Sequence, residues 1–335
     1  MGKIAPKDLM DLLTCIRRSR EVLVPPMLGY DCGVHKLDNN RCIVISTDPC
    51  VKVPLEHFGW LLFHYSASDV SVFGASPNFC TVELLGPPRT STKVFKNLLK
   101  QFCSAADDLG TVTITGHTGT YDGLHTLLGV CTAYGIIHRK DLVTPGGARP
   151  GDLILCTKPI GLEVLTNLAL VNGPLARKLF GHKRVRYLAK QVRMQSCFEE
   201  ARLLAKSRAV SAMHDVTEGG LVASLNEIAD ASNVGFVLNY QSLSVLPELR
   251  ILSEHFDLSR DQILSISSTG TLLAAIPPNH IKGILGNLRR NKVDFRIVGV
   301  FTRDRQRSLE YYDRRIKFPT RFNDPYAEIV GTDLP

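Results

Sequence analysis

Four residues in the first half of the sequence have side chains suited to metal and phosphate chemistry, and each ends or interrupts an apolar run. Asp31 precedes a hairpin, Asp48 follows RCIVIS, Asp69 lies in ASDVSVFGASP and His117 lies in TITGHTGT. Magnesium takes oxygen ligands and commonly shares one or two carboxylates with substrate phosphates. The three aspartates are therefore candidate magnesium ligands. Taken singly, each is better explained as a turn or helix-cap residue.

A second candidate site precedes and includes a glycine pair, in the stretch MHDVTEGGLVASLNEIAD. The apolar residues after the glycines recur at the spacing of one helix face and predict a helix from about Glu218. Gly219 and Gly220 at its start let the backbone approach a ligand closely, and the N–H groups of a helix start attract anions such as phosphate. The alternative is an ordinary capped helix, with Asp215 or Thr217 as the cap.

Several common nucleotide and redox motifs are absent from the sequence. It contains neither a Gly-x-x-x-x-Gly-Lys-Ser/Thr phosphate loop nor a Gly-x-Gly-x-x-Gly fingerprint. Its nine cysteines are scattered without a Cys-x-x-Cys pair, which argues against a disulfide framework or a zinc knuckle. Most cysteines are therefore expected to be buried small hydrophobes in a reducing, cytoplasmic compartment.

Length and composition indicate a folded protein with two domains. The 335 residues are 44% hydrophobic and 21% charged, as in globular chains, and no apolar run approaches membrane-spanning length. The stretch TPGGARPGD has two prolines and three glycines and predicts a linker. We therefore expect one domain over residues 1–145 and a second over residues 146–335.

Strands and helices interleave in both halves, which is typical of an α+β fold. In the first half the expected strands are Arg41–Ser46 (ended by Thr47 and Asp48), Phe79–Leu85, Thr111–Thr115 and Thr126–Ile137, with helices over residues 56–72 and Thr92–Leu109 and a loop at TGHTGTYDG. In the second half they are strands Leu153–Thr157, Gly235–Leu238, Gly270–Ile276 and Asp294–Phe301, and helices Glu163–Val171, Arg184–Ser207 and Asn279–Arg290. The residues after Phe301 show no pattern that assigns them.

Positive charge gathers late in the sequence. The net charge is +8, and much of the excess lies at Arg289, Arg290, Lys292, Arg296, Arg303, Arg305, Arg307, Arg314, Arg315, Lys317 and Arg321. Such a cluster either attracts an anionic substrate or partner or is a solvated basic face. No RNA- or DNA-binding motif accompanies it, so nucleic acid is not expected as a partner.

Five stretches together resemble a known family. STDP, ASDVSVFGASP, TITGHTGT, MHDVTEGGLVASLNEIAD and SISSTGTLLAAIP occur in the order found in the hydrogenase expression/formation protein HypE. HypE belongs to the PurM superfamily, with AIR synthase, selenophosphate synthetase and thiamine-monophosphate kinase. The resemblance spans most of the chain and implies a two-domain PurM/HypE-like fold that uses ATP with Mg²⁺.

The resemblance also implies roles for individual residues. The implied metal ligands are Asp31, Asp48 and Asp69. Nucleotide or phosphate contacts are implied for Thr47, Gly116, Thr118, Gly219 and Gly220, and catalytic roles for Asp69, His117 and Asp215. His117 departs from part of the family, where an aspartate follows the glycines. Because histidine is a poor ligand for a hard cation, His117 is expected to contact phosphate instead.

The activity implied by the resemblance is phosphoryl transfer from ATP to an acceptor oxygen of an amide, carbonyl or carboxylate. A homodimer that pairs the N-terminal sheets, with ATP sites between subunits, is implied as well. HypE carries a carbamoyl group on a cysteine at its extreme C-terminus, whereas this sequence ends EIVGTDLP and its last cysteine, Cys197, lies in a predicted helix. The expected acceptor is therefore a separate small molecule or another protein. A non-catalytic nucleotide- or partner-binding homodimer is the alternative.

Overall fold

The computed structural model describes Ile4 and residues 6–331, which form two compact units. The N-terminal unit comprises residues 16–26 and 31–142; the C-terminal unit comprises the described residues among 4–15, together with 27–30 and 143–331. The domain boundary expected between residues 145 and 146 remains a prediction. The expectation about a carrier cysteine at the chain end concerns residues 332–335, which lie outside the described part.

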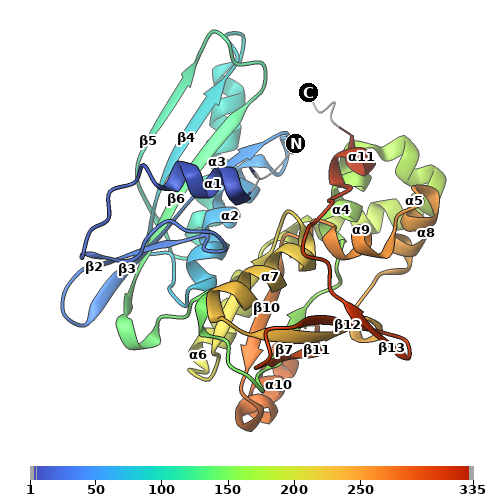
Figure 1. Ribbon diagram of the computed structural model, residues 1–335. Coiled ribbons are helices and arrows are strands. Elements are labelled where there is room, and N and C mark those ends of the chain that lie inside the picture. The colour runs from blue at the N-terminus through green and yellow to red at the C-terminus, as the bar shows by residue number, and fades with distance from the viewer. Residues whose placement is uncertain (1–3, 5, 332–335) are drawn as a thin grey trace. The chain divides into compact units, whose positions relative to one another are not determined.

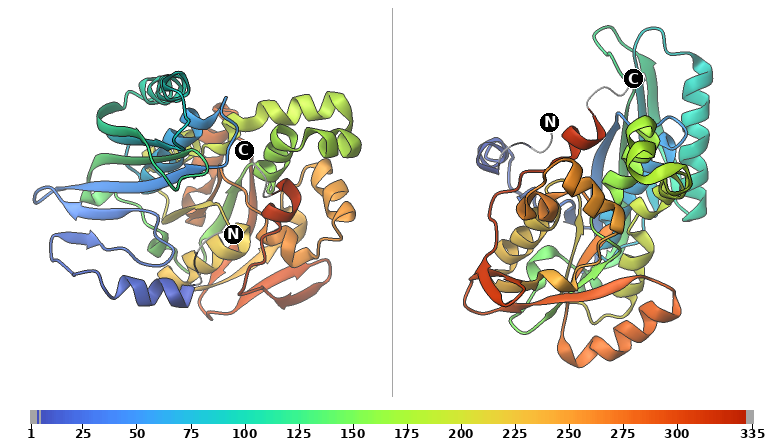
Figure 2. Two further views of the ribbon diagram at one scale, coloured as in Figure 1. Left: turned by 90° about the horizontal axis from the view of Figure 1, so that it is seen from above. Right: turned by 90° about the vertical axis from the view of Figure 1, so that its right-hand side faces the viewer.

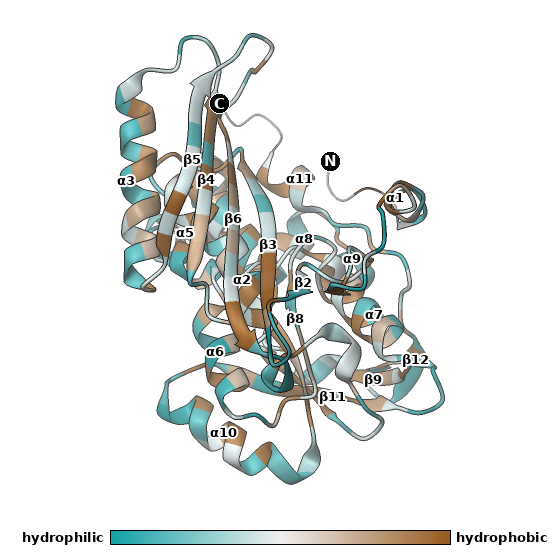
Figure 3. Ribbon diagram, turned by 90° about the vertical axis from the view of Figure 1, so that its left-hand side faces the viewer, coloured by the Kyte–Doolittle hydropathy of each residue, from teal (hydrophilic) through white to brown (hydrophobic). Residues whose placement is uncertain are grey.

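A six-stranded sheet and two helices build the N-terminal unit (Figure 1). The strands lie in the order β1 (Val22–Val24), β2 (Gly33–Lys36), β3 (Arg41–Val51), β6 (Leu128–His138), β4 (Phe79–Gly86) and β5 (Val112–Thr120). Neighbours are antiparallel except β4 and β5. Helices α2 (Phe58–Val72) and α3 (Thr92–Asp108) cover one face of this sheet (Figure 2), and Figure 3 shows the other face, which no described helix of this unit covers.

Local sequence explains how the two helices pack. The Ser91 hydroxyl accepts a hydrogen bond from the Val94 N–H and caps α3, which then buries Phe95 and Phe102. Helix α2 is buried on almost every side. A Cβ at Gly59 would lie 2.3 Å from the Leu98 carbonyl oxygen, so the close crossing of α2 and α3 requires glycine there.

The predicted end of the third strand is wrong. Instead of stopping at Thr47 and Asp48, β3 continues to Val51, because it pairs with β6 along its whole length. Strand β2 pairs with β3 only as far as Ile45, so the added part of β3 has a single paired neighbour, where Pro49 is tolerated. Pairing with β6 therefore overrides the weak strand preference of the local sequence.

The predicted loop around His117 is also wrong. Gly116, His117 and Thr118 lie within β5, an edge strand that pairs in parallel with β4. A Cβ at Gly116 would lie 2.3 Å from the Val82 carbonyl oxygen, so glycine permits this pairing. The glycine- and threonine-rich composition therefore marks an edge strand that packs closely on its neighbour.

A seven-stranded sheet forms the centre of the C-terminal unit, and its neighbouring strands are antiparallel except β9 and β12. Its strands lie in the order β13 (Arg314–Lys317), β12 (Arg307–Tyr311), β9 (Gly235–Asn239), β11 (Phe295–Thr302), β7 (Leu153–Thr157), β10 (Thr271–Ile276) and β8 (Ala212–Val216). The helices are α1 (Pro6–Leu13), α4 (Leu162–Val171), α5 (Gly173–Ala189), α6 (Phe198–Lys206), α7 (Gly220–Ser232), α8 (Pro247–His255), α9 (Arg260–Ser265), α10 (Ile281–Arg290) and α11 (Tyr326–Val330). The predicted α+β class is confirmed.

The expected single helix over Arg184–Ser207 is wrong. It divides into the end of α5, a 3₁₀ segment at Lys190–Gln195, and α6. The Lys158 ammonium accounts for the break, because it donates hydrogen bonds to the Met194 and Ser196 carbonyl oxygens, at 3.1 and 2.6 Å. No helix among the described residues combines the length and apolarity needed to cross a bilayer.

Candidate functional site

Asp48 and Asp69 come together in the N-terminal unit. Asp48 lies on β3 and Asp69 lies in the last turn of α2. The Ser46 hydroxyl oxygen is 3.0 Å from Asp48 Oδ2 and 2.7 Å from Asp69 Oδ2, and the Ser66 hydroxyl is 3.4 Å from Asp48 Oδ2. Ser46, Ser66 and Asp69 are buried and Asp48 is half-buried. Two carboxylates and two hydroxyls therefore meet where β3 faces α2.

The spacing of these residues explains the cluster. Ser46 and Asp48 are two residues apart on a strand, and Ser66 and Asp69 are three apart on a helix, so each pair shares a face. A hydroxyl has one proton, so Ser46 donates to only one of the two carboxylates at a time. The set offers only hard oxygen donors and two like charges, which is a donor set that fits Mg²⁺. The two serines gave no sequence signal beyond this face-sharing with an aspartate.

Asp31 lies in the same part of the N-terminal unit. It is half-buried and stands two residues before β2, which begins at Gly33 opposite Ile45. Because β2 and β3 are antiparallel, Asp31 lies toward the part of β3 that holds Asp48. The structure joins Asp48 and Asp69 through Ser46, while the participation of Asp31 in the same metal site remains a prediction.

Thr47 points away from the carboxylates. Successive strand residues face opposite sides of a sheet, so Thr47 lies on the face without helices while Ser46 and Asp48 face α2. Its hydroxyl oxygen is 2.9 Å from that of Thr132 on β6. A phosphate contact by Thr47 is therefore predicted for the open face of the sheet.

The predicted site residues of β5 also divide between the two faces. His117 pairs with the exposed Glu83 of β4 on the open face, and its Nε2 is 2.6 Å from the Tyr121 hydroxyl. The side chain of its neighbour Thr118 points to the opposite face, and its other neighbour, Gly116, has no side chain. His117 therefore shares a face with Thr47, at the other side of the sheet in the strand order.

Asp215 lies in the C-terminal unit on β8, a strand that the sequence did not predict and whose five residues are all buried. His214 Nδ1 is 2.8 Å from the Asp215 backbone oxygen, and His214 Nε2 is 2.9 Å from Glu227 Oε2. Because the Nδ1–H points to the backbone oxygen, Asp215 Oδ1 receives no hydrogen bond from the described residues. A buried carboxylate oxygen without a donor is costly, so Asp215 retains the capacity to bind a donor or a cation.

The helix that begins at the glycine pair, α7, lacks the Asp215 or Thr217 cap that the sequence offered as an alternative. Gly219 is the N-cap, with φ 83°, and neither Asp215 nor Thr217 caps the helix. The Gly219 N–H instead donates to Asp324 Oδ2 at 3.1 Å. The chain's own carboxylate thus occupies an N–H group that was expected to meet an anionic ligand.

Gly220→Ala is expected to destabilise the C-terminal unit by about 2–4 kcal/mol, combining left-handed strain with overpacking. Gly220 has φ 55°, and a Cβ there would lie 2.6 Å from the Ile266 carbonyl oxygen. Urea unfolding followed by circular dichroism measures the loss. Gly283→Ala is the matched control, because a Cβ at that position of α10 meets nothing. Equal stability of the two variants would contradict the packing account.

Two acidic residues of the C-terminal unit escape the sequence patterns. Glu163 lies in the first turn of α4, and its Oε2 accepts the Thr269 N–H at 2.8 Å. Burial raises the pKa of Glu163 to about 7. Asp324 lies more than a hundred residues from the helix start that it binds. The only sequence signal for Glu163 was a single charged residue in the mostly apolar LEVLTNLALV, and an exposed acid at a helix start would give the same pattern.

Two family models match this chain. AIR synthase related protein, N-terminal domain, matches residues 29–137, and AIR synthase related protein, C-terminal domain, matches residues 149–311. Among curated relatives, the selenide, water dikinase of Nitratidesulfovibrio vulgaris (strain DSM 19637 / Miyazaki F) is 30% identical over 260 residues, which cover 73% of this chain and 69% of the relative.

Solved structures agree in fold. The hydrogenase maturation protein HypE of E. coli has a TM-score of 0.75 at 22% identity, covering 88% of this chain and 92% of that one. A hydrogenase maturation protein HypE in complex with ATP has a TM-score of 0.71 at 20% identity, covering 87% of this chain and 89% of that one. With both family domains matched in order and a 30%-identical relative covered over two thirds of its length, the chain belongs to the AIR synthase related family.

Proposed function

We propose that this protein is a magnesium-dependent, ATP-using enzyme of the AIR synthase/HypE type that transfers a phosphoryl group to an acceptor oxygen of an amide, carbonyl or carboxylate. Membership of the family supports ATP use, because one relative is named a dikinase and one HypE neighbour was solved with ATP.

The observation that carries the proposal is the joining of Asp48 and Asp69 through the Ser46 hydroxyl. Phosphoryl transfer asks a protein mainly for positioning and for charge stabilisation. When bound, Mg²⁺ supplies that charge at the phosphate oxygens. The chain's own contribution is to hold two carboxylates in fixed positions, Asp48 by its strand and Asp69 by a buried helix turn, with Asp31 as the third proposed ligand.

The remaining predicted residues complete the proposal. Phosphate or nucleotide contacts are proposed for Thr47, Gly116 and Thr118 in the N-terminal unit and, separately, for Gly219 and Gly220 in the C-terminal unit. His117 donates a hydrogen bond to phosphate rather than holding metal. Asp215 Oδ1 is buried and receives no hydrogen bond from the described residues. We propose that it accepts a hydrogen bond from the reacting group or orients that group.

The direct test is ATP turnover. Inorganic phosphate release from ATP is measured with Mg²⁺ and with EDTA, alone and with a panel of amides, carboxylates and carbonyl compounds. Turnover that requires Mg²⁺ and rises with one acceptor class supports the proposal. ATP binding without turnover, for any acceptor, supports the second candidate below.

We propose that the acceptor is a separate small molecule or a protein-borne group. Cys197 precedes the first residue of α6 and is fully buried, so its thiol is not available as a mobile carrier. Burial also raises the pKa of the Cys50 and Cys156 thiols, which makes them poor nucleophiles.

A second candidate function, a non-catalytic nucleotide- or partner-binding homodimer, is favoured by the open face of the N-terminal sheet. That face carries apolar side chains that are half-buried or exposed, at Ile43, Ile45, Phe79, Leu85, Val130, Tyr134 and Ile136. Contiguous exposed apolar surface of this kind marks an interaction site. In both candidates we propose that a two-fold axis pairs this face with that of a second copy.

Light scattering is expected to give a mass of twice 37.0 kDa in solution, because pairing removes the open face from water. Ile45→Lys places a charge on this face and is expected to give monomers. Ile251→Lys is the control, because Ile251 is an exposed residue of α8 in the C-terminal unit. A wild-type monomer that turns over ATP would remove the dimer from the proposal.

A further inference from the structure

The C-terminal segment 318–330 folds back onto the helix starts of the C-terminal unit. Asp324 accepts four hydrogen bonds, from the Gly219 N–H at 3.1 Å, the Ser267 N–H at 3.3 Å, the Ser267 hydroxyl at 2.5 Å and the Tyr326 N–H at 3.0 Å. Three of the donors lie outside the segment, one at the start of α7 and two on Ser267 in the loop before β10. Asp324 therefore fastens the segment to two other elements.

The short helix α11 at the end of this segment lies beside α4 (Figure 1). The Tyr326 hydroxyl accepts a hydrogen bond from Asn167 Nδ2 at 2.9 Å, and Ile329 and Val330 are buried in the core of the unit. We call residues Asp324–Val330 the clasp. It is held by one carboxylate, one hydroxyl and two apolar side chains.

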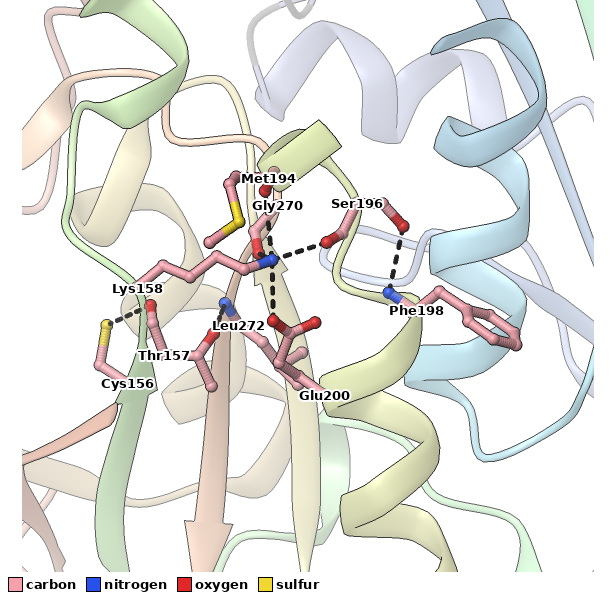
Figure 4. Close-up of polar contacts among 9 residues, drawn as sticks. All are labelled: Cys156, Thr157, Lys158, Met194, Ser196, Phe198, Glu200, Gly270 and Leu272. Carbon is pink, nitrogen blue, oxygen red and sulfur yellow. Dashed lines mark hydrogen bonds and ion pairs between the residues drawn. The ribbon is translucent and has the colours of Figure 1, made fainter. Parts of the chain in front are cut away.

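Glu163 lies under the clasp. The charged or titratable groups that act on it are all acidic: Asp324 and Tyr326 from the clasp and Glu218 from the turn before α7. No described lysine, arginine or histidine forms an ion pair with Glu163. Its Oε2 accepts the Thr269 N–H. The next residue in this loop, Gly270, is held by Lys158, whose ammonium donates to the Gly270 carbonyl oxygen at 2.8 Å (Figure 4).

The charge on Glu163 is therefore unfavourable where it sits. Burial is the largest cause that raises the pKa of Glu163, to about 7; Asp324 and Glu218 add to the rise, and hydrogen bonds from Thr269 oppose it. A carboxylate whose pKa is raised in the docked state stabilises that state when protonated. This stabilisation is complete below the ordinary pKa of 4.5 and is lost as pH rises through about 7.

We propose that the clasp is an autoinhibitory contact: Asp324 occupies the Gly219 helix start, and ionisation of Glu163 beneath the clasp releases it. This inference rests on the proposed function in one respect, namely that the α7 start meets the phosphates or the acceptor. At acidic pH the clasp holds the Gly219 N–H. At alkaline pH the repulsion between Glu163 and Asp324 opens the clasp and frees that N–H for a ligand.

Amide hydrogen exchange tests the clasp without ATP. The Gly219 and Tyr326 amides, both bonded to Asp324, are followed at pH 6 and pH 8 and corrected for the chemical rate of exchange. In the wild type, opening is expected to increase about tenfold between these pH values, the ratio that follows from pKa values of 4.5 and 7 in the open and docked states. No increase would overturn the proposal.

Three variants assign the effect. Glu163→Gln is near-isosteric and cannot ionise, so opening is expected to be equally low at both pH values. Glu254→Gln makes the same change at an exposed position of α8 and is expected to behave as the wild type. Asp324→Asn is expected to open the clasp at both pH values. A tenfold pH dependence that persists in Glu163→Gln would overturn the role of Glu163.

ATP turnover then tests inhibition separately. Asp324→Asn is expected to turn over ATP faster than the wild type at pH 6 and equally at pH 8. If Asp324→Asn and the wild type turn over ATP equally at pH 6 as well as at pH 8, while hydrogen exchange shows the expected opening, the clasp opens without inhibiting turnover. That result would overturn the autoinhibitory role. A protein that turns over no ATP at all would instead count against the proposed function and leave the exchange result standing.

Discussion

Asp69→Asn is expected to abolish magnesium-dependent ATP turnover, with a fall of at least about 100-fold in kcat/KM, and to leave the fold intact. Asparagine has nearly the same shape and can still hydrogen-bond to Ser46, which lies 2.7 Å away. The substitution therefore removes the negative charge and leaves the packing unchanged. Asp69 is 7% exposed, so little water reaches this position to take the place of the lost carboxylate as a metal ligand.

Turnover of ATP by the purified variant with Mg²⁺ measures this effect, and circular dichroism confirms the fold. Asp107→Asn is the matched control, since it removes one carboxylate from an exposed position of α3 in the same unit. The control is expected to keep wild-type turnover. An Asp69→Asn protein that also keeps it would show that the cluster has no part in catalysis.

Lys158→Met is expected to cost about 3–5 kcal/mol in the free energy of unfolding, because it leaves a buried carboxylate without its cation. Lys158 is 3% exposed, and its ammonium is 3.0 Å from Glu200 Oε1. The same ammonium donates to three backbone carbonyl oxygens, of Met194, Ser196 and Gly270. One substitution therefore leaves one charge and three carbonyls unsatisfied (Figure 4).

Urea unfolding compares this variant with two others. Arg202→Met breaks an exposed pair with Glu199 on the same helix and is expected to cost less than about 1 kcal/mol. The double variant Lys158→Met/Glu200→Met removes both buried charges and is expected to recover part of the loss. A cost for Lys158→Met no larger than that for Arg202→Met would contradict the buried-pair account.

Elements with a strong repeating pattern could be predicted from the sequence. The strand Leu153–Thr157 matches β7 at both ends, and the amphipathic helix from Thr92 begins where Ser91 caps it. The ends of β3 and β5 could not be predicted, because partner strands decide them. Strand β8 escaped because His214 and Asp215 interrupt its apolar pattern, although both side chains are buried.

The candidate site shows the same division. The aspartates could be singled out because each ends or interrupts an apolar run, although Asp48 lies within β3 and not at its end. That Asp48 and Asp69 share a serine could not, since it depends on β3 lying against α2. Asp324 and Glu163 come from distant parts of the chain, and only the folded C-terminal unit shows that Asp324 accepts the Gly219 N–H and that the two carboxyl groups interact.

The most direct test of the account is a calorimetric titration of ATP into the wild type, Asp48→Asn and Asp69→Asn, each with Mg²⁺ and with EDTA. The proposal predicts that the wild type binds ATP more tightly with Mg²⁺ than with EDTA, and that both variants lose this difference while remaining folded. Wild-type magnesium dependence in both variants would contradict the central claim that these two carboxylates hold the metal.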